Sequence, residues 1–225
     1  MRKIFIGDVH GCNGSLCSLL TEIRLNIDDD LLVFLGDYFD GGPDAFRVWQ
    51  TLQKLKTVMG NRCVLLCGNH EFMMLDSASA GSWPVLFGWR TVASIENNQK
   101  TASELTTWVK ENTCPWYEDD EIIAVHGGLS DQSKLQKQLV YDIVWDRDTF
   151  EKGTYNGGKP AICGHTPQKE PRWSHDGITE TATDGPLPDH GLINIDTDCV
   201  AGNCLTALVL ENGRMSFYHS AAEKR

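Results

Sequence analysis

Three short polar segments, each directly after a hydrophobic run, constrain the fold of this chain more than any other feature. They are GDVHG at 7–11, GDYFD at 36–40 and GNHE at 68–71. Glycines there let the backbone turn sharply and leave room beside an ion, while Asp, His and Asn supply oxygen and nitrogen donors. Strand ends that deliver such donors to one edge of a sheet are typical of an α/β protein with a metal centre. The chain is therefore expected to bind metal and to use it in catalysis.

The hydrophobic pattern between these segments alternates between strand and helix. Buried strands are predicted at 2–6, 31–35 and 63–67, and apolar residues at helical spacing predict helices at 15–25 and from Pro43 onward. This βαβαβ order implies parallel strands with right-handed crossovers. The three polar segments should therefore emerge at the same edge of one sheet.

Beyond the third segment the pattern is looser. A stretch at 77–98 rich in Gly, Ser and Trp is expected to cap the site, and a helix is expected at 102–110. Strands at 122–125 and 161–163 should lead into two more polar segments, HGG and GHTP.

The C-terminal third is predicted to be mostly strands. A polar segment at 171–190 is expected to form a long exposed loop. A meander should follow it, with strands at 192–195, 205–210 and 215–218.

Composition limits the class of protein and its partners. A length of 225 residues fits one domain, 1–225. The net charge of -11 opposes nonspecific binding to nucleic acid or to an anionic membrane surface. No apolar run has the length of a secretory signal or a membrane span, and the cysteines suit a reduced interior, so a cytoplasmic protein is expected.

The segments GDVHG, GDYFD, GNHE, HGG and GHTP, in this order and each at a predicted strand end, resemble the phosphoprotein phosphatase family of metallophosphoesterases. The resemblance extends to 194–197 and is strongest to the bacterial and phage branch, which includes serine/threonine protein phosphatases and diadenosine tetraphosphate hydrolases. It implies the calcineurin-like metallophosphoesterase fold, an α/β fold with a central β-sandwich of two mixed sheets flanked by helices.

The resemblance also implies a dinuclear metal centre. Its ligands would be Asp8 and His10 on one ion, Asp37 as the bridging carboxylate, and Asn69, His126 and His165 on the other. Two divalent ions so placed activate a hydroxide that attacks phosphorus. Manganese is expected from the family, and this mixture of donors also accommodates iron or zinc.

Three further residues match the family's catalytic groups. His70 would donate a proton to the leaving oxygen, Asp40 would orient the His70 ring and raise its pKa, and Arg147 would grip the phosphoryl group. The family usually carries arginine after the second motif, where this chain has Gly41. Arg90 is the leading substitute for that phosphate contact, and Arg47 is the weaker one.

Some residues stand outside this pattern. Asp198 occupies a position where bacterial relatives usually carry glycine, and no catalytic role is assigned to it. His175, His190 and His219 lie outside every motif and are expected to be solvated.

The leading functional interpretation is a monomeric serine/threonine protein phosphatase, which would also accept phosphotyrosine if the missing arginine leaves the cleft open. The alternative is a hydrolase of diadenosine tetraphosphate or another nucleotide polyphosphate. Such an enzyme needs cationic and aromatic groups, which could be Arg90, Trp83, Trp89 and Trp116. A phosphoprotein-binding module without activity is a third interpretation, suggested only by the missing arginine. Either enzyme would act on a phosphorylated protein or a small phosphoester.

Overall fold

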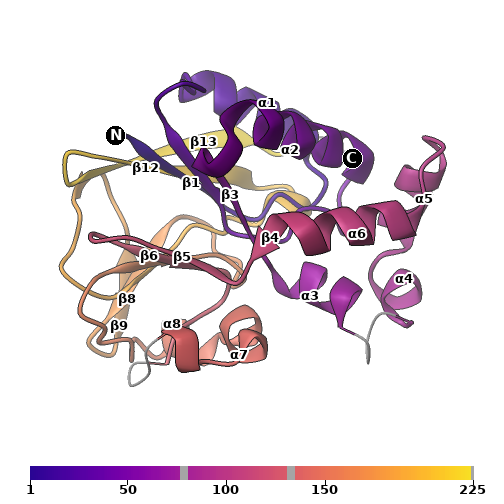
Figure 1. Ribbon diagram of the computed structural model, residues 1–225. Helices are drawn as coiled ribbons and strands as arrows, with labels where there is room; N and C mark the ends of the chain where they lie inside the picture. Colours follow the sequence, from indigo (N-terminus) through magenta and orange to yellow (C-terminus); the bar gives the residue numbers. More distant parts are fainter. Residues whose placement is uncertain (77–80, 131–134, 224–225) are drawn as a thin grey trace.

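The computed structural model describes residues 1–76, 81–130 and 135–223. Their strands form two mixed β-sheets that pack face to face, with helices on the outer sides (Figure 1). This is the central β-sandwich that the sequence analysis predicts. Within the described residues, no helix is both long and apolar enough to cross a membrane.

The first sheet contains the predicted βαβαβ unit. Strands β1 (Lys3–Ile6), β2 (Leu31–Phe34) and β3 (Cys63–Leu66) are parallel neighbours, connected by α1 (Asn13–Glu22) and α2 (Ala45–Met59). The sheet has the order β10-β13-β12-β1-β2-β3-β4. Its other strands are β4 (Thr113–Cys114), β10 (Gly185–Pro186), β12 (Cys204–Glu211) and β13 (Arg214–Ala221). The parallel pairing brings the three polar segments to one edge, as predicted.

The second sheet has the order β5-β6-β7-β11-β8-β9. Its strands are β5 (Trp116–Glu118), β6 (Ile123–Val125), β7 (Ala161–Cys163), β8 (Arg172–His175), β9 (Ile178–Thr181) and β11 (Leu192–Asn194). Strands β6, β7 and β11 are parallel. The short helices α7 (Val140–Trp145) and α8 (Asp148–Glu151) lie beside this sheet (Figure 1).

Successive side chains of a strand point to opposite faces of its sheet, so the buried apolar residues form three clusters: outside the first sheet, between the sheets and outside the second sheet. On β1, Phe5 points between the sheets toward Ile193, whereas Ile4 and Ile6 point outward and pack with residues of α1 and α2. A third cluster, which includes Val125 and Phe150, covers the outer face of the second sheet. Both sheets are therefore buried on both faces near their centres, which explains the unbroken apolar runs in the sequence.

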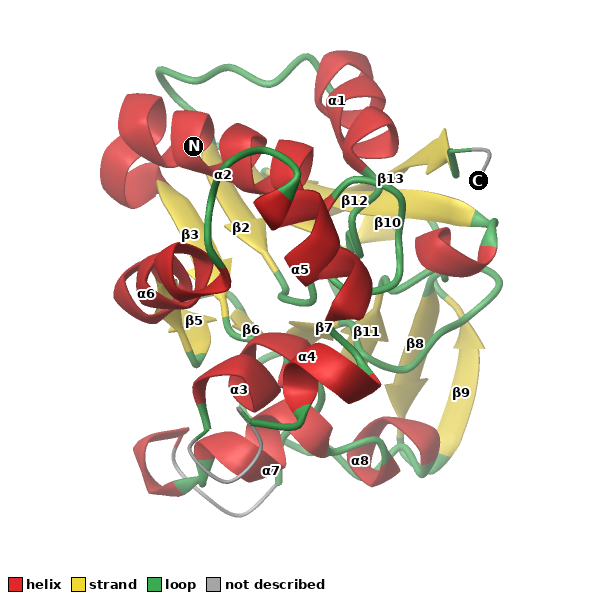
Figure 2. Ribbon diagram, turned by 90° about the vertical axis from the view of Figure 1, so that its right-hand side faces the viewer, coloured by secondary structure: helices red, strands yellow, loops and turns green. Residues whose placement is uncertain are grey.

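The helices after β3 lie over the edge where the polar segments emerge. They are α3 (Asn69–Leu75), α4 (Trp83–Leu86), α5 (Trp89–Glu96) and α6 (Ala102–Asn112). Figure 2 shows α4 and α5 in front of the strands. The expected cap at 77–98 is thus partly helical, and residues 77–80 lie outside the described residues.

Two predictions for the C-terminal third are wrong. The segment 171–190 is not one long loop, because it contains the β8–β9 hairpin and the short strand β10. The predicted meander also fails, because β11 pairs with β7 and β8 in the second sheet while β12 and β13 pair with each other in the first. Polar side chains on the exposed face of the hairpin hid its strands from a search for apolar runs.

A partly buried ion pair fixes the start of the first sheet. Asp30 accepts hydrogen bonds from Arg2 Nε at 3.0 Å and Nη2 at 2.6 Å, and from the backbone N–H of Asn26 at 2.8 Å. Burial opposes ionisation, but these hydrogen bonds outweigh it and lower the pKa of Asp30 below its ordinary value.

We therefore expect Asp30→Asn to lower the free energy of unfolding by about 1–3 kcal/mol at pH 7. A lowered carboxyl pKa stabilises the fold above the unfolded-state value, and this contribution disappears as the pH falls below about 4. Urea unfolding at pH 7 and pH 3 measures both effects. Asp28→Asn, at an exposed position in the same turn, is the control. An equal loss at both pH values would contradict the prediction.

Candidate metal centre

The residues predicted to bind metal all follow strand ends at one edge of the two sheets. Asp8 and His10 follow β1, Asp37 follows β2, Asn69 follows β3, His126 follows β6 and His165 follows β7. The first three strands belong to the first sheet and the last two to the second. The fold therefore brings together donors that are as far as 157 residues apart, since the His165 backbone N–H donates to Asp8 Oδ2 at 3.1 Å.

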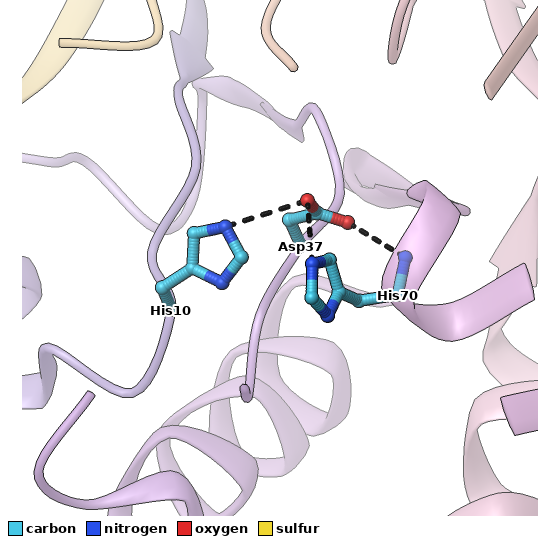
Figure 3. A group of neighbouring side chains, drawn as sticks. All are labelled: His10, Asp37 and His70. Atoms are coloured by element: carbon cyan, nitrogen blue, oxygen red, sulfur yellow. Dashed lines mark hydrogen bonds and ion pairs between the residues drawn. The ribbon is translucent and has the colours of Figure 1, made fainter. Parts of the chain in front are cut away.

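Asp37 lies between two groups of imidazoles. Its Oδ2 is 3.4 Å from His10 Nε2 and 4.0 Å from His70 Nε2, as seen in Figure 3. Its Oδ1 is 3.5 Å from His126 Nε2. Potential ligand atoms of Asp37, His126 and His165 lie within 4.8 Å of one another, and so do those of His10, Asp37 and His70. A carboxylate whose two oxygens face different donor groups has the arrangement needed to bridge two cations.

Backbone carbonyls set the orientation of two of these rings. His10 Nδ1 donates to the Asp40 carbonyl at 2.7 Å, and His126 Nδ1 donates to the Leu35 carbonyl at 2.9 Å. A carbonyl only accepts, so Nδ1 must carry the proton and Nε2 presents a lone pair when the ring is neutral. In both rings Nε2 faces Asp37, as a ligating nitrogen would.

Several buried polar atoms lack the partners that burial normally requires. Asp8 Oδ1 and His165 Nε2 are buried and make no hydrogen bond with the part of the chain that the structure describes. His126 Nε2 lies 2.9 Å from Asn69 Oδ1, and burial lowers the pKa of His126, so the neutral ring brings two acceptors face to face. Unpaired buried acceptors are costly, and a cation would satisfy them. The residues present therefore fit divalent metal.

The carboxylates give a second indication. Burial, together with the charges of Asp196 and Asp37, raises the pKa of Asp8 well above its ordinary value. Burial also raises the pKa of Asp196 to about 6. Three acidic side chains are thus brought close in an interior where they repel one another. Positive ions between them would remove this repulsion.

The backbone adopts an unusual conformation at three of the expected ligands. His10, Asp37 and His165 have φ angles of 44°, 52° and 66°, in the left-handed region that non-glycine residues seldom occupy. Such conformations concentrate at functional sites, where the surrounding structure enforces them. Glycine is required beside two carboxylates, because a Cβ at Gly68 or Gly164 would collide with Asp37 Oδ1 or Asp8 Oδ1.

Glu71 is a residue whose role sequence reasoning missed. It is fully buried and accepts hydrogen bonds from the backbone N–H groups of Asp37 at 2.7 Å, Tyr38 at 2.9 Å and Gly68 at 3.1 Å. Burial and the Asp37 charge raise its pKa to about 7. Glu71 therefore joins the turns after β2 and β3 and positions Asp37. The sequence did contain one signal for this role: Glu71 is the only carboxylate in the GNHE segment, and the sequence analysis assigns it no function.

Asp196, at the end of β11, was also missed as a candidate for the site. The sequence analysis uses the segment 194–197 only as part of the family resemblance. The repulsion between Asp196, Asp8 and Asp37 can be recognised only in the folded structure, where these side chains come close together. Next to it, Asp198 has a φ of 56° and donates its N–H to Asp196 Oδ1 at 3.0 Å. A left-handed turn explains why glycine suits this position and why aspartate is tolerated there.

His70 and Asp40 form the predicted pair. His70 Nδ1 donates to Asp40 Oδ2 at 2.8 Å, and its Nε2 is directed toward Asp37. Burial opposes protonation of the ring, but Asp37 and Asp40 outweigh it and raise the pKa of His70. The buried Asp40 also accepts from Trp83 Nε1 at 2.7 Å and from the Thr91 hydroxyl. Because the Trp83 side chain is buried and hydrogen-bonded to Asp40, its ring cannot stack on a ligand in this conformation.

The arginines lie farther out. Arg147, exposed at the start of α8, lines a surface cavity of about 670 Å³ and contributes, after burial and His126, to lowering the pKa of His165 to about 3. Arg90, also exposed, donates to the Gly41 carbonyl at 3.0 Å, and its guanidinium lies 5.0 Å from the centre of the Trp89 ring. Arg47 is exposed on α2. Roles for these arginines in substrate binding stay predictions.

Comparison with known proteins identifies relatives across most of the chain. The family described as calcineurin-like phosphoesterase matches residues 1–193. An asymmetrical bis(5'-nucleosyl)-tetraphosphatase of Anoxybacillus flavithermus is 28% identical over 90% of this chain and 88% of its own length. Serine/threonine-protein phosphatase 1 of Salmonella typhimurium is 27% identical over 72% of this chain and 77% of its own.

A crystal structure described as that of a candidate diadenosine tetraphosphatase superposes with a TM-score of 0.71 at 20% identity. The match covers 97% of this chain and 93% of that one. At this identity the likeness supports the fold alone.

With manganese as the probe ion, we expect wild type to hold two ions per chain and Asp37→Asn fewer than one, because both donor groups share this carboxylate. His165→Asn should retain one ion, since His165 belongs to only one group. Metal analysis after dialysis against manganese measures both. His219→Asn, outside these groups, should retain two. Two ions in Asp37→Asn would refute the shared role.

Proposed function

The chain belongs to the calcineurin-like phosphoesterase family and is a metallophosphoesterase, and on this premise we propose that its substrate is a bis(5'-nucleosyl) tetraphosphate. The relative named as acting on this class of substrate aligns over 90% of the chain, against 72% for the serine/threonine phosphatase. This preference reverses the order of the two enzyme interpretations drawn from the motifs. Residues 1–225 would act as one catalytic domain.

Cleavage would break a bridging P–O bond of the polyphosphate while the oxygen of water joins phosphorus. Two divalent ions, for which we propose manganese, would supply a polarised phosphoryl group and an activated water when held by Asp8, His10, Asp37, Asn69, His126 and His165. His70 Nε2 would give its proton to the leaving phosphate oxygen, since this nitrogen points toward Asp37 while Nδ1 is held by Asp40. Asp40 would keep the ring oriented and favour its protonated form.

The observation that carries the choice of substrate is the cavity beside His165. Its lining includes Trp145, whose ring centre lies 6.0 Å from that of His165, and Gly128, two residues after His126. Tyr141, with 57% of its surface exposed, lies 6.2 Å from Trp145 between ring centres. The exposed ring of Tyr141, beside the partly buried Trp145, would suit a nucleobase, because stacking is worth about 1–3 kcal/mol per base.

Cationic groups border the same cavity. Lys137 and Arg147 contribute to its lining and would bind the phosphates that are not being cleaved. Asp142, Asp146 and Asp148 also line it, so its carboxylates outnumber its two cations and phosphate contacts would have to be made by these two side chains individually. Arg90 lines another cavity, of about 510 Å³, together with Gly42 and Asn97. None of the expected metal ligands lines either cavity, but only the first has a lining residue, Trp145, in ring contact with one of them, His165. We therefore favour Arg147 over Arg90 as the phosphate-binding arginine.

A protein phosphatase is the second candidate. The Salmonella typhimurium relative supports it, with 27% identity over 72% of this chain. Both candidates would use the same metal ligands and the same His70, so the two differ only in what the surroundings of the centre bind.

We expect the manganese-loaded protein to cleave diadenosine tetraphosphate with a kcat/KM at least about 10-fold above that for phosphoserine or phosphotyrosine peptides, the difference that stacking of one base would supply. Released phosphate and nucleotides measure the rates. The kcat/KM of the His70→Asn variant should be about 10²–10⁴-fold lower, with unchanged metal content. Such a loss would exclude a contaminating phosphatase as the source of the activity. A preference for either peptide would overturn the proposed substrate and favour the second candidate.

Tyr141→Ala should raise the KM for diadenosine tetraphosphate by about 10-fold and leave the KM for p-nitrophenyl phosphate unchanged, because only the dinucleotide has a base to stack. Steady-state kinetics with both substrates test this. Val140→Ala is the matched control, since Val140 is exposed beside Tyr141 but does not line this cavity. Equal effects on the two substrates would show that the base does not use this surface.

A further inference from the structure

A second group of potential metal ligands lies away from the candidate metal centre. His175 and Asp176 are at the turn of the β8–β9 hairpin, and His190 comes from the loop before β11. His175 Nδ1 is 3.2 Å and His190 Nε2 is 3.0 Å from the same oxygen, Asp176 Oδ2. The sequence analysis expects both histidines to be solvated, with no role in a site. The structure instead brings them to one carboxylate.

Packing that needs no metal holds the two segments together. The rings of Trp173 and His175 are stacked, with their centres 3.6 Å apart. Trp173 Nε1 donates to the His190 carbonyl at 3.1 Å, which ties the loop to β8. Gly191 has a φ of 93°, and a Cβ there would collide with Trp173 Nε1. The loop therefore approaches β8 at a fixed position, and His190 is brought to the hairpin in advance of any ligand.

We propose that His175 Nδ1, His190 Nε2 and Asp176 Oδ2 bind a zinc ion. Tetrahedral zinc with bonds of about 2.0–2.1 Å separates its ligand atoms by about 3.3 Å. The two nitrogen–oxygen separations are close to this value, and all three ligand atoms lie within 4.8 Å of one another. Two imidazoles and one carboxylate suit zinc better than calcium or magnesium, which prefer oxygen alone.

Glu180 completes the expected surroundings of such a site. Its Oε1 lies 3.4 Å from His175 Nε2, the nitrogen that would not bind the ion. A ligating histidine usually donates its other N–H to a carboxylate, which fixes the ring and makes the ligating nitrogen more basic. Asp176 is 61% exposed in its side chain, so a water can occupy the fourth position of the ion.

This site is separate from the catalytic centre. Strand β11 begins directly after His190 and Gly191 and leads to Asp196, so the two groups lie at opposite ends of the strand. In the antiparallel pairing of β8 with β11, the position nearest the catalytic centre is Arg172, whereas His175 is at the far end of β8. Zinc would join the hairpin to the loop before β11 and stabilise the folded state by binding to it alone.

The test is the zinc content of the manganese-loaded protein after equilibrium dialysis against zinc. Any zinc that enters the catalytic centre is common to all variants, so the difference between them reports the new site. We expect wild type to hold one more zinc ion per chain than His190→Gln or His175→Gln. His219→Gln is the matched control, because His219 is on β13 beside Thr206, and it should hold as much zinc as wild type.

Two further readouts separate loss of the site from loss of the fold. Cobalt bound in place of zinc should give the visible absorption of a tetrahedral ion, and its amplitude should fall in Asp176→Asn, an exposed substitution. Zinc should raise the Tm of wild type more than that of His190→Gln, while circular dichroism of the two proteins without zinc stays the same. Equal zinc content and equal Tm shifts in wild type and the three site variants would overturn the proposal.

Discussion

The position of the Asp37 carboxylate is the constraint on which the rest of the site depends. It lies between two groups of histidines, and it is held there by the turn after β2, whose N–H groups bind Glu71. The same Glu71 carboxylate holds the N–H of Gly68 and so fixes the turn after β3. The absence of a side chain at Gly68 lets Asp37 Oδ1 approach. These features belong together because a buried carboxylate is costly unless hydrogen-bond donors or cations lie close enough to pair with it.

The cap helices α4 and α5 contact the candidate site directly, in addition to lying over it. Asp40 orients His70, and Asp40 is itself held by Trp83 at the start of α4 and by Thr91 in α5. His70 on α3, the proposed proton donor, is thus connected to two helices, α4 and α5, that carry none of the expected metal ligands. A substitution in the contacts of α4 or α5 can therefore change the orientation of His70 without touching the substrate.

The sequence predicted well where the polar segments lie, because parallel strands separated by helices leave little freedom in where their ends lie. Asp8, Asp37 and Asn69 follow such strands, and the structure brings them together. Glu71 and Asp196 were missed because their importance comes from contacts between segments, which spacing does not reveal. The β8–β9 hairpin was missed because its exposed face is polar, and the place of β11 in the second sheet depends on pairing that no local pattern determines.

The substrate class was harder to predict than the type of reaction, because the motifs do not include the residues that would contact the rest of the substrate. The motifs supply donors that act on phosphorus, and these are shared by enzymes that act on proteins and on nucleotides. The residues that we propose distinguish the two, such as Tyr141 and Lys137, lie in a segment with no recognisable motif. The protein phosphatase interpretation rested on those shared donors, so it could not exclude the dinucleotide alternative that the relatives favour.

The expected ligands come from both layers of the sandwich, and this has a mechanical consequence. Asp8, Asp37 and Asn69 belong to the edge of the first sheet, whereas His126 and His165 belong to the edge of the second. Ions held among them would cross-link the two layers at this edge. Parting of the sheets at this edge would then require metal release, so metal occupancy would add to the rigidity that apolar packing between the sheets already provides.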